Sequence, residues 1–365
     1  MKIALFADGS SVHTEKWIAG LKLNLDCEID LIHLNPQPVR AGVLQAIGES
    51  HVHDFAPKSI HESGGNYQYL LQAPAIRRRI RALKPEMVHT IYLTSYGFLG
   101  ALCKGRAKLV HLIIGSDILV TPKRGFPFKN MARWSLARAD LVMSVSRNLA
   151  NAAVHDLGLP ECKVLAQHYG LESWVLDYPR PAQEYTFVSN RAWMDNSNLP
   201  LIIESLSECP SEDVAVVGAP TRGNEVLGER IQRMLNAQPH LKHFPSLAHE
   251  KNIALVAASK FLISWTFTDG TPSSVMEAMA VGTIPIVSDT APNREWVQDG
   301  VNGFLIPLAD TAGIRRQLNR AITMPDAEAA RMIAYNKNVV RERATLKTNM
   351  GRLVARMKIL LQAGA

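Results

Sequence analysis

The sequence has no long hydrophobic run. Across its 365 residues, no apolar stretch approaches the roughly 18 residues that a membrane-spanning helix needs. The opening MKIALFADGSS is interrupted by Asp8, so we expect no signal peptide. Low-complexity tracts are absent too, and a content of 47% hydrophobic and 20% charged residues is typical of a globular chain. These absences argue against integral membrane and disordered proteins, and the length favours two domains.

Cysteine is also scarce. The sequence contains no C-x-x-C pair, and its four cysteines lie far apart, at Cys27, Cys103, Cys162 and Cys209. This spacing predicts free thiols in a reducing cytoplasm and excludes a zinc site made of cysteines. His, Asp and Glu do not cluster at ligand spacing in the sequence and D-x-D is missing, so we expect neither a metal nor another cofactor.

A dinucleotide fingerprint is missing as well. The turn Asp8–Ser11 connects the first apolar run to a helix that opens near His13, and it lacks the pattern G-x-G-x-x-G. A dehydrogenase-type domain is therefore disfavoured. The turn still places Gly9 at a helix start, where an anion can bind.

Positive charge is present in excess and is unevenly spread. Of a net charge of +7, the segment from Pro74 to Arg138 carries thirteen Lys/Arg against two acids, a local excess of eleven. Such asymmetry indicates an anionic partner, either a membrane surface or a diphosphate-bearing acceptor. A solvated helix face is the alternative for any single cluster. Nucleic acid is disfavoured because aromatic side chains are not interleaved with these cations.

The first half alternates short apolar runs with helical periods, which predicts a parallel doubly wound sheet. The segment Gln37–Gln68 has no clear period and is read as a long loop with at most one helix. Helices are predicted at His13–Leu23 and Ala75–Leu83. Strands are predicted at Lys2–Phe6, Glu28–His33, Glu86–Ile91, Lys108–Ile114, Asp140–Ser144 and Cys162–Ala166.

The alternation stops at a Pro-containing polar stretch, Trp174–Glu184, which is read as a linker, and then starts again. Strands are predicted at Tyr185–Ser189, Asp213–Val217, Phe261–Trp265 and Ile284–Val287. Helices are predicted at Pro200–Ser207, Asn224–Asn236, Leu247–Ala258 and Ala312–Ile322, with mostly helix after Pro325.

One strand-turn-helix unit in this half predicts an anion site. Thr271 is the predicted N-cap of a helix with Pro272 in its first position, and Gly282 is its predicted end. The helix start would offer the amides of three residues to a phosphate, namely Ser273, Ser274 and Val275. Two carboxylates flank this start, Asp269 before it and Glu277 inside the helix.

At these residues the chain resembles the GT4 family of retaining glycosyltransferases, which have the GT-B fold. The family motif E-G-x-P-x-x-x-x-E is matched by Asp269-Gly270-Thr271-Pro272 and by Glu277, with Asp in place of the first Glu. The following EAMAVGTIPIVSD and the later DGVNGFLIP also resemble the family's downstream signature.

The resemblance implies an α/β architecture of two Rossmann-like, doubly wound domains that face a cleft. We expect a C-terminal helix that crosses back, because this is common in the family. The predicted division is an acceptor-binding domain at 1–173, a linker at 174–184, a donor-binding domain at 185–340 and the last helix at 341–365.

The resemblance also implies residue roles in the second domain. Glu277 would accept hydrogen bonds from ribose hydroxyls, and Asp269 would face the donor sugar. Arg191 would neutralise the donor diphosphate, with a surface Arg as the alternative. The family's second cation is absent, because Asn196 stands in its place; Arg222, Lys251 or Arg294 would have to substitute for it.

In the first domain the implied roles are less specific. Gly9 and His13 would approach the donor diphosphate or the acceptor. The family's sugar-contacting His is missing, since Ile114 stands at its place, and His111 and Asp117 are the nearby candidates for the acceptor or the domain cleft. A core histidine is the alternative for His111.

The predicted function is metal-independent, retaining transfer of a sugar from a nucleotide-sugar to a glycan or polyprenyl-diphosphate-linked acceptor. We expect it to take place in the cytoplasm, on the inner membrane face, during surface polysaccharide biosynthesis. A nucleotide-sugar 2-epimerase and a non-catalytic sugar-nucleotide binder are the alternatives.

Overall fold

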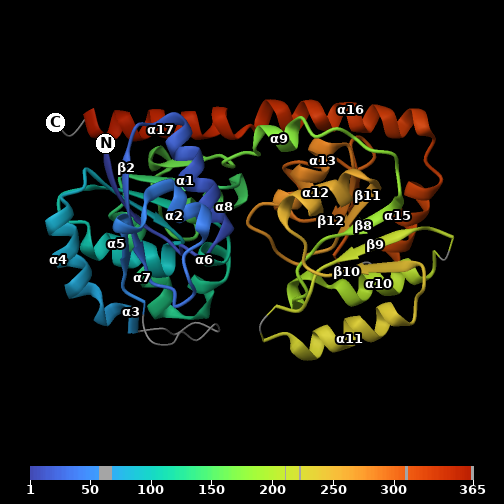
Figure 1. Ribbon diagram of the computed structural model, residues 1–365, viewed down its shortest axis with the longest axis horizontal. Helices are drawn as coiled ribbons and strands as arrows, with labels where there is room; N and C mark the ends of the chain where they lie inside the picture. Colours follow the sequence, from blue (N-terminus) through green and yellow to red (C-terminus); the bar gives the residue numbers. More distant parts are fainter. Residues whose placement is uncertain (57–67, 210, 222, 309–310, 363–365) are drawn as a thin grey trace. The chain divides into compact units, whose positions relative to one another are not determined.

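A computed structural model describes residues 1–56, 68–209, 211–221, 223–308 and 311–362. The chain packs as two compact units, one formed by Met1–Gly170 with Leu346–Ala365 and the other by Leu171–Thr345. Both units are α/β (Figure 1). Within the described ranges, no helix is both long and apolar enough to cross a membrane.

The first unit is built on a parallel sheet with the strand order β3-β2-β1-β4-β5-β6-β7. The order reverses between β1 and β4, which are hydrogen-bonded neighbours, so ligands are expected at the carboxyl ends of these strands. The strands are β1 (Lys2–Phe6), β2 (Glu28–His33), β3 (Val52–Asp54), β4 (Met87–Ile91), β5 (Lys108–Ile113), β6 (Leu141–Ser144) and β7 (Val164–Ala166). All six predicted strands are present, and β3 is an additional one.

Helices cover both faces of this sheet (Figure 1). They are α1 (Val12–Asn24), α2 (Ala41–Ile47), α3 (Gln68–Leu71), α4 (Ala73–Leu83), α5 (Phe98–Cys103), α6 (Ser116–Leu119), α7 (Phe126–Ala137), α8 (Arg147–His155) and α17 (Leu346–Gln362). The predicted loop Gln37–Gln68 contains both α2 and β3, so much of it is regular structure. Its residues 57–67 lie outside the described ones.

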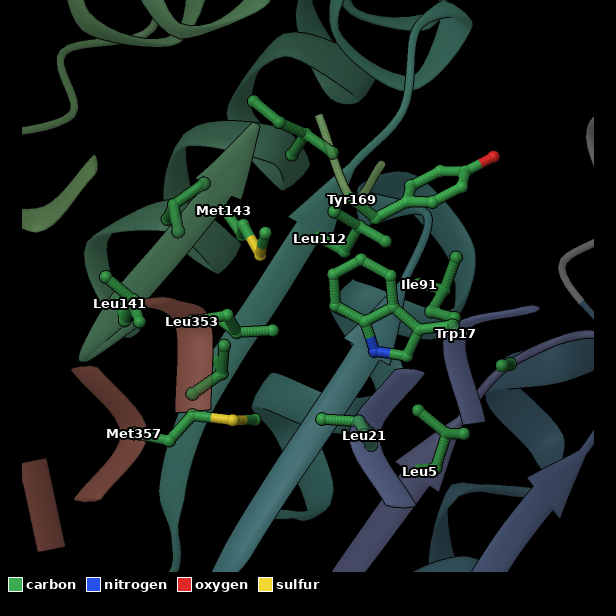
Figure 2. Packing of buried hydrophobic residues seen from close by; sticks show 14 of the residues in the cluster. Leu5, Trp17, Leu21, Ile91, Leu112, Leu141, Met143, Tyr169, Leu353 and Met357 are labelled. Atoms are coloured by element: carbon green, nitrogen blue, oxygen red, sulfur yellow. The ribbon is translucent and has the colours of Figure 1, made fainter. Parts of the chain in front are cut away.

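The C-terminal helix α17 belongs to the core of the first unit. Figure 2 shows Trp17 and Leu21 of α1 beside Leu353 and Met357 of α17, all packed over the sheet. The two helices approach so closely that a Cβ at Gly20 would lie 2.7 Å from the Met350 side chain. Each large apolar side chain buried in this way contributes roughly 1.5–3 kcal/mol to stability.

The second unit has a parallel six-stranded sheet with the order β10-β9-β8-β11-β12-β13, which reverses between β8 and β11. The strands are β8 (Tyr185–Ser189), β9 (Val214–Val217), β10 (Leu241–Phe244), β11 (Ser259–Ser264), β12 (Ile284–Ser288) and β13 (Phe304–Ile306). The two edge strands, β10 and β13, were not predicted. They are only four and three residues long, too short to show a period.

The helices of the second unit include all five that the sequence predicts before Pro325. They are α9 (Ser173–Leu176), α10 (Leu199–Ser207), α11 (Glu225–Asn236), α12 (His249–Ala257), α13 (Ser273–Val281), α14 (Ala291–Arg294), α15 (Thr311–Ile322) and α16 (Asp326–Arg343). Residues 174–184, which were read as a linker, belong to this unit. Val175 is buried in its core, and Arg180 donates a hydrogen bond to the Gly282 carbonyl.

Three imidazoles buried in the first unit make its stability depend on pH. Burial lowers the pKa of His89 and of His111 to about 4, and that of His168 to about 3, against 6.5 for a free imidazole. The unfolded chain therefore binds more protons than the folded one as pH falls below 6.5. Stability that is fully present above pH 6.5 is lost as pH falls toward 4.

We expect the free energy of unfolding to fall between pH 6.5 and pH 5, by roughly 1.4 kcal/mol per pH unit for each proton taken up. Urea denaturation at several pH values measures this slope. His111→Gln should reduce the slope, whereas His155→Gln, at an exposed position, should not. A free energy that is constant over this range would contradict the prediction.

Candidate functional site

The candidate site lies at the carboxyl edge of the second sheet, where the strand order reverses. Arg191 follows β8 by two residues, and Asp269 lies in the loop after β11. Because β8 and β11 are parallel neighbours, their carboxyl ends bring these two loops together. This is the edge at which open α/β sheets bind ligands.

Arg191 and Asp269 contact each other although they are 78 positions apart in sequence. The Arg191 Nη2 donates to Asp269 Oδ2 at 3.2 Å, and its Nη1 donates to Ser274 Oγ at 3.4 Å. The two charged side chains are 20% and 18% exposed, so the pair is largely shielded from water. The guanidinium thus lies beside the start of α13, where it pairs with a carboxylate.

The start of α13 differs from the prediction. The helix begins at Ser273, with Pro272 as an N-cap that has no side-chain cap, so Thr271 is not the N-cap. The Ser273 amide donates to the Thr271 carbonyl and the Val275 amide to the Pro272 carbonyl. Of the three amides predicted to be free, Ser274 alone has no backbone acceptor within the described chain. The predicted end is correct, because Gly282 has φ +91°, the left-handed conformation that favours glycine.

Glu277 is positioned by a histidine that the sequence analysis missed. Its side chain extends from the second turn of α13 and is 8% exposed, and its Oε1 lies 2.8 Å from His249 Nε2. His249 begins α12, and its ring meets Trp174 edge-on at 5.2 Å. The sequence could have indicated His249. In a parallel α/β unit, the helix that precedes a strand begins at the carboxyl edge of the sheet, and His249 is the first residue of the helix before β11.

Asn196, which replaces the family's second cation, fastens the loop that carries Asp269. Its Nδ2 donates to the Thr268 carbonyl at 2.8 Å, and its Oδ1 accepts from the Thr268 amide at 3.1 Å. The backbone carbonyl of Asn196 also accepts from the Phe267 amide. A lysine side chain has no acceptor, so it could not accept the hydrogen bond from the Thr268 amide. Asn at this position therefore fixes the loop but provides no positive charge.

The three proposed substitutes for the missing cation differ in their surroundings. Arg294 is exposed and is held by Asp289, whose pKa is lowered by the hydrogen bond from this guanidinium. Lys251 is exposed on α12. Arg222 lies outside the described residues. Arg191 is therefore the cation whose contacts connect it to the helix start.

Several buried polar atoms around this edge have no hydrogen-bond partner in the described part of the chain. They are Ser189 Oγ, Asn190 Oδ1 and Thr271 Oγ1. Gly270 and Pro272 beside them are buried. Three unpaired groups near one sheet edge are unusual, because buried polar atoms are normally satisfied.

In the first unit, the Gly9 amide already has a hydrogen-bond acceptor within the chain, and a role of Gly9 in anion binding stays a prediction. It donates to His33 Nδ1 at 3.0 Å, and the opposite nitrogen of that imidazole donates to the Gln37 carbonyl. Glycine is favoured here because an added Cβ would lie 2.9 Å from the Val39 side chain, which would have to shift. The turn therefore favours Gly9 for close packing.

His13 lies at the carboxyl edge of the first sheet, as expected for a residue that opens α1. It is exposed, and its Nδ1 lies 3.1 Å from the Tyr169 hydroxyl. The helix is capped by Ser11, whose hydroxyl accepts from the His13 amide. The role of His13 toward a donor or an acceptor stays a prediction.

His111 and Asp117 are core residues, and the expectation that they face an acceptor is wrong. Both are fully buried, and this burial is what lowers the pKa of His111. His111 bonds Thr90 Oγ1 through one nitrogen and Ser135 through the other. Asp117 accepts hydrogen bonds from the Leu93 and Gly115 amides, at 2.9 and 2.8 Å, and so joins the loops that follow β4 and β5.

The structure brings one group with metal-ligand spacing together within the described ranges, which the sequence analysis did not expect. Atoms of Glu28, Asp30 and His51 lie within 4.8 Å of one another. The Lys2 ammonium is 2.7 Å from Glu28 and 3.5 Å from Asp30, and its pKa is raised chiefly by the hydrogen bond to Glu28. The cation already placed between the carboxylates favours an ion-pair network.

Comparison with protein families covers both units. Residues 2–146 match the family described as Glycosyl transferase 4-like, and residues 181–339 match Glycosyl transferases group 1. The chain is a GT4-like glycosyltransferase of the GT-B fold. A search of curated protein sequences gives no match.

Solved structures of several glycosyltransferases share the fold of this one. The Anabaena protein Alr3699/HepE in complex with UDP and glucose is 16% identical, with a TM-score of 0.78 over 98% of this chain and 99% of that one. Sucrose-phosphate synthase from Thermosynechococcus elongatus is 14% identical, with a TM-score of 0.82 over the whole of both chains. The lipopolysaccharide outer core galactosyltransferase WaaB is 13% identical, with a TM-score of 0.73 over 98% and 99%.

In this glycosyltransferase, the residues that match the family motif surround one helix start. Asp269 lies in the loop before it, Glu277 lies in the second turn of the helix, and Arg191 contacts Ser274 and Asp269 from the loop that follows β8. These contacts connect side chains that belong to separate parts of the sequence.

Proposed function

We propose that this glycosyltransferase transfers a sugar from a nucleotide-sugar to a glycan or polyprenyl-diphosphate-linked acceptor, with retention of the anomeric configuration. The observation that carries the proposal is the contact of Arg191 with both Asp269 and Ser274 at the start of α13. A cation, a helix start and a carboxylate at one point suit a diphosphate that leaves a sugar.

Each residue would have a separate task in this reaction. The donor diphosphate would displace Asp269 from Arg191, which frees the carboxylate to face the sugar. Glu277, held by His249, would accept hydrogen bonds from the ribose hydroxyls. UDP is the first nucleotide to test, because Alr3699/HepE was solved with UDP and glucose.

The chemical step that we propose is a front-side displacement. The bond between the anomeric carbon and the diphosphate oxygen breaks, and the acceptor oxygen forms a bond on the same face. The departing diphosphate takes the acceptor's proton, while Arg191 and the helix start stabilise its charge. No residue in this scheme needs a metal ion, so we propose a metal-independent reaction without another cofactor.

We further propose that the enzyme acts in surface polysaccharide biosynthesis, in the cytoplasm and on the inner membrane face. The excess of eleven positive charges between Pro74 and Arg138 supports attraction to anionic lipids. Partition onto anionic vesicles tests this part, and a loss of binding at raised salt is the expected result.

The transfer itself is tested by incubating the protein with UDP-sugars and a set of polyprenyl-diphosphate and glycan acceptors. The expected result is a product whose anomeric configuration, read by proton NMR, equals that of the donor. Inversion would overturn the retaining mechanism. Conversion of the donor without any acceptor would instead indicate an epimerase.

A further inference from the structure

The first unit contains a cavity of about 710 Å³ whose charged lining residues are all positive. Three segments form it, namely the end of α4, the loop between α5 and β5, and the end of α7. No lining residue is an acid, and the six cations are Arg77, Arg81, Lys84, Lys104, Arg106 and Arg138. We call this cavity the cationic pocket.

The cationic pocket lies at the opposite edge of the sheet from Gly9 and His13. Its segments precede β4, β5 and β6, three neighbouring parallel strands, so it lies at their amino ends. Gly9 and His13 follow the carboxyl end of β1 in the same sheet. The six residues of β5 separate the two edges by about 20 Å.

Helix ends explain part of this charge but not all of it. The carboxyl ends of helices carry partial negative charge and attract cations. Arg77 donates to the Leu102 carbonyl, in the last turn of α5, at 2.8 Å. Lys104 is held differently, because it donates to the Ala107 carbonyl in the loop before β5 at 3.0 Å and lies 3.9 Å from an Asp140 carboxylate oxygen. The side chains of Arg81, Lys84 and Arg106 make neither an ion pair nor a hydrogen bond with any residue that the structure describes. Contacts within the described fold therefore do not account for these three cations.

Two of the arginines are held in place before any ligand arrives. The Leu102 carbonyl fixes Arg77 on one wall, and the Arg138 guanidinium packs over the Trp134 ring on another, 4.3 Å from its centroid. Between them, Gly105 turns the loop with φ +62° and has no atom within 4 Å of an added Cβ. Ordered guanidinium groups lose little entropy on binding and match phosphate oxygens in pairs.

We propose that the cationic pocket is a binding site for a ligand with clustered phosphate groups. Several like charges in one concavity repel each other and concentrate counter-ions, and a multiply charged phosphate compensates them best. The volume is within the range of small-molecule sites, so it suits several phosphates better than one. This chemistry is shared by anionic lipid headgroups and by soluble polyphosphates. The inference does not depend on the transferase reaction, but its lipid outcome rests on the attraction to anionic lipids that is proposed above for the same segment.

Titration calorimetry of the full chain with tripolyphosphate, and sedimentation with phosphatidylcholine vesicles with or without phosphatidylglycerol, test the proposal. The variant Arg81→Gln/Arg106→Gln removes two cations of the pocket. The matched control, Arg78→Gln/Lys123→Gln, removes two exposed cations of the same basic segment that do not line it. Thermal unfolding checks that both variants are folded.

We expect the pocket variant to weaken binding by about tenfold or more and the control to change it little. Tripolyphosphate binding would identify a soluble phosphate as the ligand class, and binding to anionic vesicles alone would identify lipid headgroups. Saturation with UDP should leave either result unchanged, which separates this site from the donor site. Failure to bind either probe, or equal weakening in both variants, would overturn the proposal.

Discussion

Arg191→Met is expected to lower kcat for sugar transfer by about 10²- to 10³-fold, the loss typical of removing one charge-stabilising donor from a transition state. The leaving diphosphate gains charge as the glycosidic bond breaks, and the guanidinium is already positioned beside the helix start by Ser274 and Asp269. Steady-state release of the nucleoside diphosphate measures the effect.

The matched control is Arg294→Met. Arg294 lies in the same unit and also pairs with an aspartate, Asp289, but it is exposed and does not contact α13 through any described bond. It should change kcat by less than about twofold, in keeping with the small effect of exposed ion pairs. An Arg191→Met enzyme that keeps its wild-type kcat would show that the diphosphate is stabilised elsewhere.

Glu277→Ala is expected to weaken binding of the nucleoside diphosphate by about 10²-fold. A buried carboxylate that accepts two hydroxyl protons makes charge-assisted hydrogen bonds, which contribute about 1.5–3 kcal/mol each. His249 holds one carboxylate oxygen, so the group is oriented before the ligand arrives. Calorimetric titration with UDP and with its 2′-deoxy form separates this role from a general loss of stability.

The wild-type protein should prefer the ribose form, and Glu277→Ala should lose that preference. Glu250→Ala, an exposed carboxylate at the start of the neighbouring α12, is the matched control and should retain it. Unchanged discrimination between the two sugars in Glu277→Ala would place the ribose away from α13.

The central elements of both sheets could be predicted from the sequence because they are buried apolar runs. The strands Lys2–Phe6 and Glu28–His33 have the predicted bounds, and their side chains are almost entirely buried. The strands that were missed, β3, β10 and β13, lie at sheet edges and are too short to show a period, and β3 and β10 also have few buried residues. Val52–Asp54, for example, contains only one buried residue.

The features of the candidate site that depend on neighbouring residues in the sequence could be predicted. The features that depend on hydrogen bonds to residues distant in sequence could not. Gly282 ends α13 because a left-handed residue is needed there, which is visible in the sequence. The Gly9 amide is occupied by His33, 24 positions away, and no local pattern reveals such a partner. The same holds for Asn196, whose bonds to Thr268 span 72 positions.

The family resemblance by itself predicts that Arg191, Asp269 and Glu277 bind one donor, through its diphosphate, its sugar and its ribose. It could not show that Arg191 pairs with Asp269, or that His111 and Asp117 are buried. A family motif indicates which residues have a chemical role, whereas the burial of a residue depends on how this particular chain packs.

The most direct test of the account is a thermal unfolding panel of the wild-type protein with UDP, GDP, ADP and dTDP and their common sugars. The account predicts that one nucleotide raises the unfolding midpoint by several degrees, because a ligand at 100 times its Kd adds about 2.7 kcal/mol. That shift should disappear in Glu277→Ala. No shift with any of the four nucleotides would contradict the claim that the start of α13 is a donor site.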